Sequence, residues 1–167
     1  MEHNMVGYGS LISHNSLKET INNKHFKPVI MKGYKRIFDI YSKKNANSDV
    51  LNIKKSKNSK LNGVMFKVND LELEKIKKRE DWYSLKKVKA YDFESGKLLG
   101  ECFIVIDYTI RIDKENKLPS KCYFISCREA AYHINKKFGN FWDKTTFTSD
   151  NETVSEWIKK HREYNTL

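Results

Sequence analysis

Two short stretches of this sequence contain residues whose types and spacing could support chemistry, and the first is VGYGSL at residues 6–11. Two glycines flank Tyr8 there, close to the start of the chain. Glycine tolerates positive φ and lets a ligand approach the backbone, so consecutive amides from Gly7 to Leu11 could bind a carboxylate or an oxyanion. A tight bend after a strand, packed by Tyr8, would explain the same residues without any ligand.

The second stretch is a helix expected over residues 70–80. At about 100° per residue, Leu73, Ile76 and Glu80 fall on one stripe, which places a carboxylate on the apolar face. A desolvated carboxyl group has a raised pKa and is suited to accept and return a proton near neutral pH. The helix could instead end before Glu80 and leave the side chain in water, and the spacing alone leaves both interpretations open.

Apolar and β-prone runs predict the strands that position these two stretches. We expect strands at residues 4–8, 29–41, 50–53, 61–68, 88–93 and 98–106. The polar stretches at residues 42–49 and 54–60 are typical of hairpin tips. Four capping patterns predict helix starts: Ser16-x-x-Glu19, Asn69-x-x-Glu72, Ser126-x-x-Glu129 and Ser149-x-x-Glu152. Strands that follow one another by short turns, with helices inserted, favour an α+β fold with a curved, barrel-like mixed sheet.

Length and composition indicate the class of protein. The 167 residues are 39% hydrophobic and 13% aromatic, which is typical of one domain with its own core, so we expect residues 1–167 to form a single domain. No run approaches the roughly 18 consecutive apolar residues of a membrane span, and the first residues are too polar for a secretory signal. We therefore expect a soluble, cytoplasmic protein without a membrane partner.

Cysteines and histidines give no sign of a metal site or a disulfide framework. Cys102, Cys122 and Cys127 form no C-x-x-C pair and are odd in number, so reduced thiols are expected. The sequence around Cys102, ECFIVID, is typical of a buried strand, and a cysteine nucleophile is not indicated. The histidines show neither H-E-x-x-H nor another ligand spacing, which argues against zinc.

The formal net charge of +11 raises the possibility of nucleic-acid binding, since clustered cations release counterions from phosphates. Nearly all of this charge is lysine, and the arginines are spread along the chain without a cluster. Bidentate reading of bases prefers arginine. The composition therefore weighs against a nucleic-acid partner.

Several short motifs, taken together and in this order, resemble the gamma-glutamyl cyclotransferase-like superfamily. They are Y-G-S-L at residues 8–11, Gly33-Tyr34 followed by Phe38, Gly63 at the start of a strand, and R-E-x-x-Y at Arg79, Glu80 and Tyr83. The resemblance covers about the first two thirds of the chain. Each motif is short, but their order is far more specific than any one of them.

The resemblance implies a fold, a reaction and a set of site residues. In that superfamily the α-amine of a γ-glutamyl group attacks its own γ-carbonyl, which releases 5-oxoproline and a free amine without a metal or cofactor. Glu80 would be the general acid and base, and Tyr83 would orient Glu80 or the ligand, although a core tyrosine explains Tyr83 equally well. The substrate-binding loop would be Tyr8, Gly9, Ser10 and Leu11.

One position leaves the substrate open. Many members have asparagine after Y-G-S, whereas Leu11 matches the leucine of another part of the superfamily, which includes its glutathione-degrading branch. The superfamily also contains proteins without a defined activity, so a non-catalytic metabolite-binding or interaction protein is the alternative. A lysine-rich nucleic-acid-binding protein is a further alternative. If Glu80 were not catalytic, Asp81 and Glu101 would be the carboxylates to consider.

Overall fold

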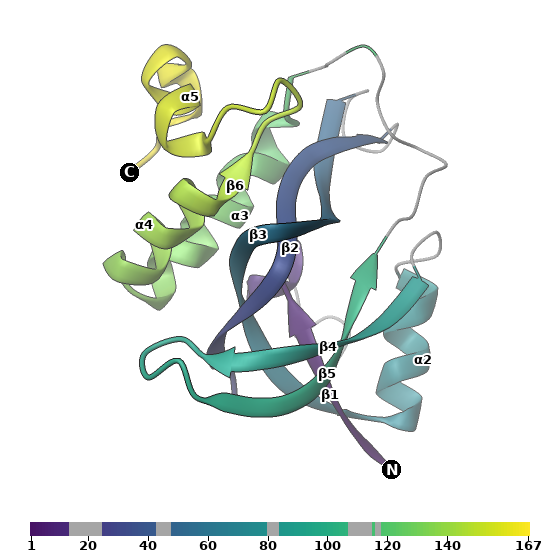
Figure 1. Cartoon of the computed structure of the whole chain (residues 1–167). Helices are drawn as coiled ribbons and strands as arrows, with labels where there is room; N and C mark the ends of the chain where they lie inside the picture. Colours follow the sequence, from purple (N-terminus) through teal and green to yellow (C-terminus); the bar gives the residue numbers. More distant parts are fainter. Residues whose placement is uncertain (14–24, 43–47, 80–83, 107–114, 116–117) are drawn as a thin grey trace.

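The computed structural model describes residues 1–13, 25–42, 48–79, 84–106, 115 and 118–167 (Figure 1). Its strands are β1 (Glu2–Gly7), β2 (Lys27–Ser42), β3 (Ser48–Asn69), β4 (Ser84–Asp92), β5 (Leu98–Ile106) and β6 (Thr146–Phe147). Its α-helices are α2 (Asp70–Arg79), α3 (Lys121–Ile134), α4 (Lys136–Thr145) and α5 (Val154–Lys160). Two short 3₁₀ turns are η1 (Ser10–Ile12) and η3 (Arg162–Tyr164).

The strands form a ring of pairings. The sheet order is β3-β1-β5-β4-β2-β6, and β2 also pairs with β3, so that β3, β1, β5, β4 and β2 close on themselves. Strand β1 is antiparallel to β3 but parallel to β5, with Met5 opposite Phe103. Because β1 and β5 are parallel, their C-terminal ends lie at the same end of the ring. The expected α+β fold with a curved sheet is confirmed.

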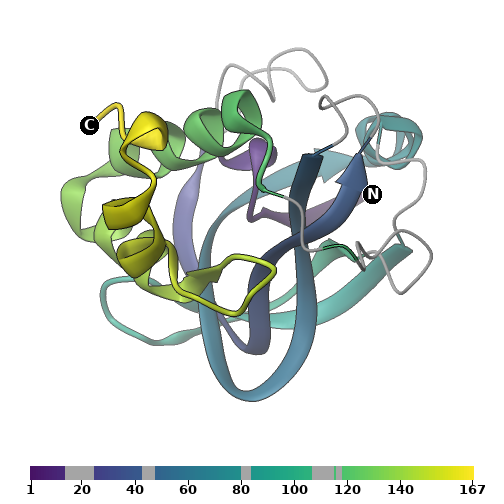
Figure 2. The ribbon, with the colours of Figure 1, turned by 90° about the horizontal axis from the view of Figure 1, so that it is seen from above.

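The helices lie on two sides of the ring. In Figures 1 and 2, α3, α4 and α5 lie together on one side of the strands, and α2 lies on the other. Helix α4 contacts β2 and β3, whereas α2 contacts β1 and β3. The core on the first side is aromatic: the ring of Phe38 lies 5.4 Å from that of Phe124, 6.3 Å from that of Tyr123 and 6.4 Å from that of Trp142. This packing fixes α3 against the strands.

The helix before Glu80 begins where the sequence predicts. The Asn69 side chain accepts a hydrogen bond from the Glu72 amide at 2.9 Å, and the Glu72 carboxylate accepts one from the Asn69 amide at 2.9 Å. This reciprocal pair satisfies two amide donors at the start of α2. Leu73 and Ile76 are buried, which confirms the apolar stripe. The expected continuation of that stripe to Glu80 lies outside the described residues, as does the helix predicted to begin at Ser16.

Three predicted boundaries are wrong. Residues 54–60 do not separate two strands, because β3 runs through them and accommodates extra residues by a register shift against β2 between Lys32 and Tyr34. Helix α3 begins after Ser120, well before Ser126, and ends at Ile134. The next residue, Asn135, accepts a hydrogen bond from the Phe138 amide through its side chain and caps the start of α4. Helix α5 begins after Thr153 instead of Ser149. The capping patterns at Ser126 and Ser149 therefore occur by chance, the first inside α3 and the second in the turn before α5.

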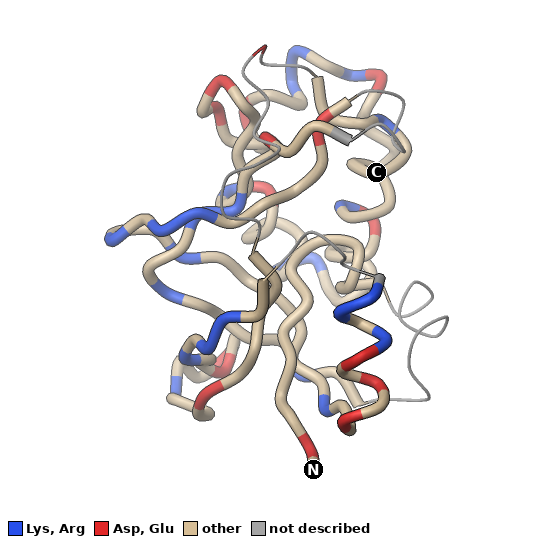
Figure 3. Tube along the Cα trace, turned by 90° about the vertical axis from the view of Figure 1, so that its right-hand side faces the viewer, with Lys and Arg blue, Asp and Glu red and all other residues tan. Residues whose placement is uncertain are grey.

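The described residues contain no helix that is long and apolar enough to cross a membrane. Figure 3 shows basic positions spread over several parts of the trace, with acidic positions among them.

The predicted hairpin of β4 and β5 is confirmed, and Asp92 closes its turn by accepting hydrogen bonds from the Ser95 amide and hydroxyl, both at 2.8 Å. Hydrogen bonds to its charged form lower the pKa of Asp92 to about 2, with Lys27 contributing.

Candidate functional site

The residues 8–11 loop leaves β1 at the end of the ring where β5 also ends. After Gly7 the chain turns into η1, and the Ile12 amide donates to the Gly9 carbonyl at 2.9 Å. The Tyr8 hydroxyl donates to the carbonyl of Val105 at 2.8 Å. Tyr8 is only 5% exposed, so its side chain joins the loop to the C-terminal end of β5 from inside the core.

A small pocket lies directly at this loop. The described residues that line it are Tyr8, Gly9, Ser10, Leu11, Leu51, Val105 and Tyr123. Its volume is about 30 Å³, comparable to the space of one or two water molecules. All four loop residues predicted from the sequence therefore line one pocket, which as its described residues shape it is smaller than a ligand-sized cavity.

Tyr123 is a site residue that sequence reasoning missed. It lies in the first turn of α3, and its hydroxyl is 2.9 Å from the position a Cβ atom would take on Gly9. Its side chain also hydrogen-bonds Cys127 one turn along the helix. Pro119 and Ser120 before it are a helix-start signal that would have placed Tyr123 in a first turn. No pattern in the sequence indicates that Tyr123 lies close to Gly9.

Arg36 on β2 is a second residue that the sequence did not indicate. It is fully buried, and one Nη donates to the Tyr8 carbonyl at 3.1 Å and to the Asn62 carbonyl at 2.7 Å. The other Nη donates to Asn62 Oδ1 at 2.8 Å, and Nε donates to Thr146 Oγ1 at 2.7 Å. The guanidinium lies 4.9 Å from the centre of the Trp142 ring. Burial lowers the pKa of Arg36 to about 9, which leaves it a cation at neutral pH.

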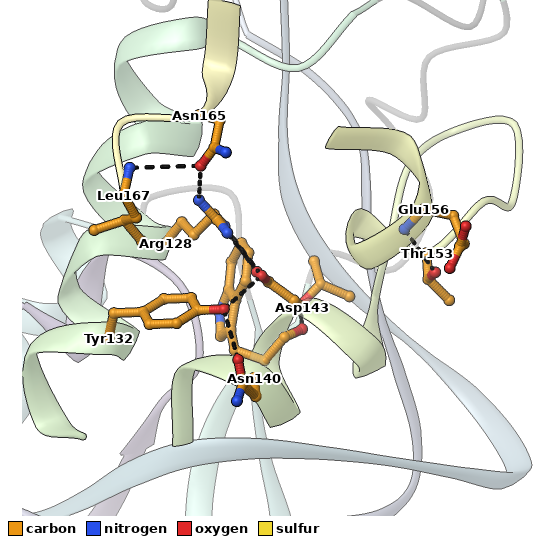
Figure 4. A network of polar contacts seen from close by, with 10 residues as sticks. Arg128, Tyr132, Asn140, Asp143, Thr153, Glu156, Asn165 and Leu167 are labelled. Carbon is orange, nitrogen blue, oxygen red and sulfur yellow. Dashed lines mark hydrogen bonds and ion pairs between the residues drawn. The ribbon is translucent and has the colours of Figure 1, made fainter. Parts of the chain in front are cut away.

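A second buried arginine has a different environment. Arg128 on α3 donates to both carboxylate oxygens of Asp143 on α4, with Nε 2.9 Å from Oδ1 and Nη2 2.9 Å from Oδ2 (Figure 4). Tyr132 donates to the same carboxylate at 2.8 Å, and Arg128 Nη1 donates to Asn165 at 2.9 Å. This network joins α3, α4 and the C-terminal segment, and none of its residues lines the pocket.

Asp39 on β2 is another buried acidic group. It is 3% exposed and forms an ion pair with Lys54 on β3. Burial raises the pKa of Asp39, while Lys54 and Asn52 oppose that shift. The pairing of Asp39 with a neighbouring strand explains it as a structural group, since it does not line the pocket.

The thiols and potential metal ligands do not form a reactive centre in the described part of the chain. Burial raises the pKa of Cys102 to about 12 and that of Cys127 to about 12, so neither is a ready thiolate. No group of three His, Cys, Asp or Glu side chains gathers among the described residues in a way that could bind a metal ion.

Glu80 and Tyr83 lie outside the described residues, so the shared site predicted for Glu80 and the loop stays a prediction. The described chain resumes at Ser84, which pairs with Ile106 in the hairpin of β4 and β5. The next pair joins Leu85 to Val105, a residue that lines the pocket and accepts the Tyr8 hydrogen bond. Strand β4 therefore starts at the end of the ring where the loop lies.

Solved structures share this arrangement across nearly the whole chain. One described as a gamma-glutamyl cyclotransferase has a TM-score of 0.71 at 15% identity and covers 99% of this chain and 100% of that one. An uncharacterized protein from Homo sapiens has a TM-score of 0.73 at 17% identity, with coverage of 97% and 98%. A gamma-glutamyl cyclotransferase specific to glutathione from yeast has a TM-score of 0.66 at 14% identity, with coverage of 99% and 97%.

At these sequence identities, the similarity to the solved structures is a similarity of backbone structure. The sequence matches no protein-family model and no curated protein. Identities of 14 to 17% show a shared fold and leave the activity to be argued from the residues of the site. This chain has the gamma-glutamyl cyclotransferase-like fold.

Proposed function

We propose that the protein is a cofactor-independent cyclotransferase that converts a γ-glutamyl amine or peptide into 5-oxoproline and the free amine. The observation that carries this proposal is the pocket lined by Tyr8, Gly9, Ser10 and Leu11 at the end of β1. It lies in a chain whose fold is shared with gamma-glutamyl cyclotransferases. The substrate is a small molecule, held at this loop.

The reaction requires two proton transfers and one acyl transfer. The α-amine first loses a proton and attacks the γ-carbonyl carbon, which forms the lactam C–N bond. The bond from that carbon to the leaving nitrogen then breaks, and the leaving nitrogen gains a proton. A carboxylate with a raised pKa can accept the first proton and return it to the leaving amine. In this proposal Glu80 is that carboxylate.

The loop supplies orientation and electrostatic stabilisation in this mechanism. Gly9 lets the Tyr123 hydroxyl and the Leu51 side chain lie close to the loop backbone. The amides of Ser10 and Leu11 at the start of η1 have no partner within that short turn. Such amides can hold a substrate carboxylate or the developing oxyanion. Holding the γ-glutamyl chain folded brings its amine to its own carbonyl, which is the main entropic barrier to closing a five-membered ring.

Chain connectivity supports Glu80 as the partner of this loop. Three residues separate Glu80 from Ser84, so their Cα atoms are four steps apart along the chain and within about 14 Å of each other. Ser84 begins β4 opposite Ile106, and the next residue, Leu85, lies opposite the pocket-lining Val105. Tyr83 directly precedes that strand, and its proposed role is to orient Glu80 or the ligand.

A screen of γ-glutamyl compounds, including glutathione, for release of 5-oxoproline tests the function. We expect at least one compound to be cyclised, and we expect turnover to survive a chelator because no metal enters the mechanism. Binding of these compounds without turnover would instead indicate a non-catalytic binding protein. If no γ-glutamyl compound binds or reacts, the proposal is wrong.

Replacing Glu80 by glutamine tests the proposed acid and base. The change keeps the volume but cannot accept a proton, so turnover should fall by about 10² to 10⁴ with little change in melting temperature. Glu74→Gln in α2 is the matched control, because Glu74 is exposed and its described ion pair is with Lys77. Wild-type turnover in Glu80→Gln would shift attention to Asp81 and Glu101.

A further inference from the structure

The two buried arginines differ in how their charges are compensated. Arg128 is paired with the Asp143 carboxylate, whereas every hydrogen bond of Arg36 goes to a neutral oxygen. Among the described residues no carboxylate forms an ion pair with Arg36. Burying a cation without a directly paired counter-charge is costly, although the Asp143 carboxylate favours the charged form of Arg36 from beyond ion-pair distance. A neutral hydrogen-bond donor could occupy the same space, so the positive charge of Arg36 requires a separate explanation.

Arg36 acts on the loop through one peptide group. Its Nη donates to the Tyr8 carbonyl, and the described chain contains no cis peptide bonds. In a trans peptide the carbonyl and the following N–H point in opposite directions, so this contact turns the Gly9 N–H away from the guanidinium. No acceptor in the described part of the chain receives that N–H. Gly9 itself lines the pocket.

We propose that Arg36 is a positioning residue that orients the Tyr8–Gly9 peptide and makes the pocket selective for a ligand with an anionic group at the loop. This inference rests on the proposed function, in which that group is the α-carboxylate of the γ-glutamyl moiety. The charge acts from behind the loop, across one peptide group and the hydrogen bonds on either side of it, which corresponds to a separation on the order of 8 Å. At an effective dielectric constant of about 20, Coulomb's law gives a preference of roughly 30-fold for an anion over a neutral isostere.

Two ligands that differ only in charge measure this selectivity. The first is 5-oxoproline, the expected product, and the second is 5-oxoprolinamide, which replaces the carboxylate by a neutral amide. Dissociation constants of both are measured by calorimetry at pH 7 with the full chain. We expect wild-type protein to prefer 5-oxoproline by roughly 10- to 30-fold.

Three variants separate the charge of Arg36 from its packing. Asn62→Asp places a carboxylate where Oδ1 now accepts from Arg36 at 2.8 Å, so it neutralises the charge and keeps the arginine. Arg36→Gln removes the charge. Both should remove most of the preference and leave the smaller part that the loop amides supply, whereas Arg36→Lys should keep most of the preference and weaken both ligands. Arg128→Lys is the control, and its preference should equal that of wild-type protein even if its stability falls.

The outcomes distinguish this inference from the function on which it rests. If Arg36→Gln fails to fold, Asn62→Asp still decides, because aspartate and asparagine have nearly the same shape and the change removes one hydrogen bond, from Asn62 Nδ2 to the Phe138 carbonyl. A folded Asn62→Asp variant with the wild-type preference would overturn the role of Arg36 while cyclisation of a γ-glutamyl compound still supported the function. If wild-type protein neither binds 5-oxoproline nor cyclises any γ-glutamyl compound, both proposals are wrong.

Discussion

The hydroxyl oxygen of Tyr123 lies 2.9 Å from the point that a Cβ atom would occupy on Gly9, so helix α3 and the N-terminal loop approach each other only because residue 9 has no side chain. The Leu51 side chain lies 3.4 Å from the same point. Both neighbours line the pocket with Gly9. The glycine therefore determines the shape of the proposed substrate site.

Adding a side chain at residue 9 should impair substrate binding. Gly9→Ala and Gly9→Val would displace either Tyr123 or the loop, so we expect KM to rise by tenfold or more, with the larger rise for valine. Steady-state kinetics on a substrate identified by the screen measure this. The double variant with Gly9→Ala and Tyr123→Phe lacks the hydroxyl that meets the new methyl group and should recover part of the loss. An unchanged KM in Gly9→Val would contradict a role for the loop.

Breaking the ion pair between Arg128 and Asp143 should cost far more stability than breaking a surface pair. Asp143→Ala leaves Arg128 buried without its carboxylate, and such a loss typically lowers the free energy of unfolding by about 3 to 5 kcal/mol. Lys159→Met breaks an exposed pair with Glu156 and should change it by less than about 1 kcal/mol. Urea denaturation of the two variants measures both values. Similar losses in both would show that the network of Figure 4 is not a stabilising unit.

The turn at Asp92 should make stability depend on pH in acid. The pKa of Asp92 is lowered from 3.8 to about 2, so its charged form is favoured in the folded state. The resulting stabilisation is fully present above the unfolded-state pKa and is lost as pH falls through that of the folded state. Wild-type protein should thus melt at a higher temperature than Asp92→Asn at pH 6, and the difference should shrink between pH 4 and pH 2. A difference that stays constant to pH 2 would exclude this contribution.

The three thiols should differ sharply in reactivity. Cys122 is exposed, whereas Cys102 and Cys127 are buried and each has its pKa raised to about 12. In native protein at pH 7.5 we expect a chromogenic disulfide reagent to modify one thiol quickly, and to modify all three after denaturation. The Cys122→Ser variant should then show no fast reaction. Rapid modification of two or three thiols in native wild-type protein would contradict the burial.

Local sequence determined the elements whose signals come from neighbouring residues. Asn69 and Glu72 predicted the start of α2 because a capping box needs only four consecutive residues. The hairpin of β4 and β5 was predicted from its turn for the same reason. Where two local patterns compete, packing decides: Ser126 has the pattern of a cap but lies inside α3, which the contacts of Phe124 with Phe38 and Trp157 hold against the core.

The sequence by itself determined the α+β class, the position of the loop at residues 8–11 and the chemical character of its residues. Only the tertiary structure decided what surrounds that loop. Tyr123 and Arg36 reach it from α3 and β2, far away along the chain, because the strand ring closes and the helices pack on its side. No short pattern encodes such contacts, since they depend on the burial of the whole aromatic core and on the register between strands.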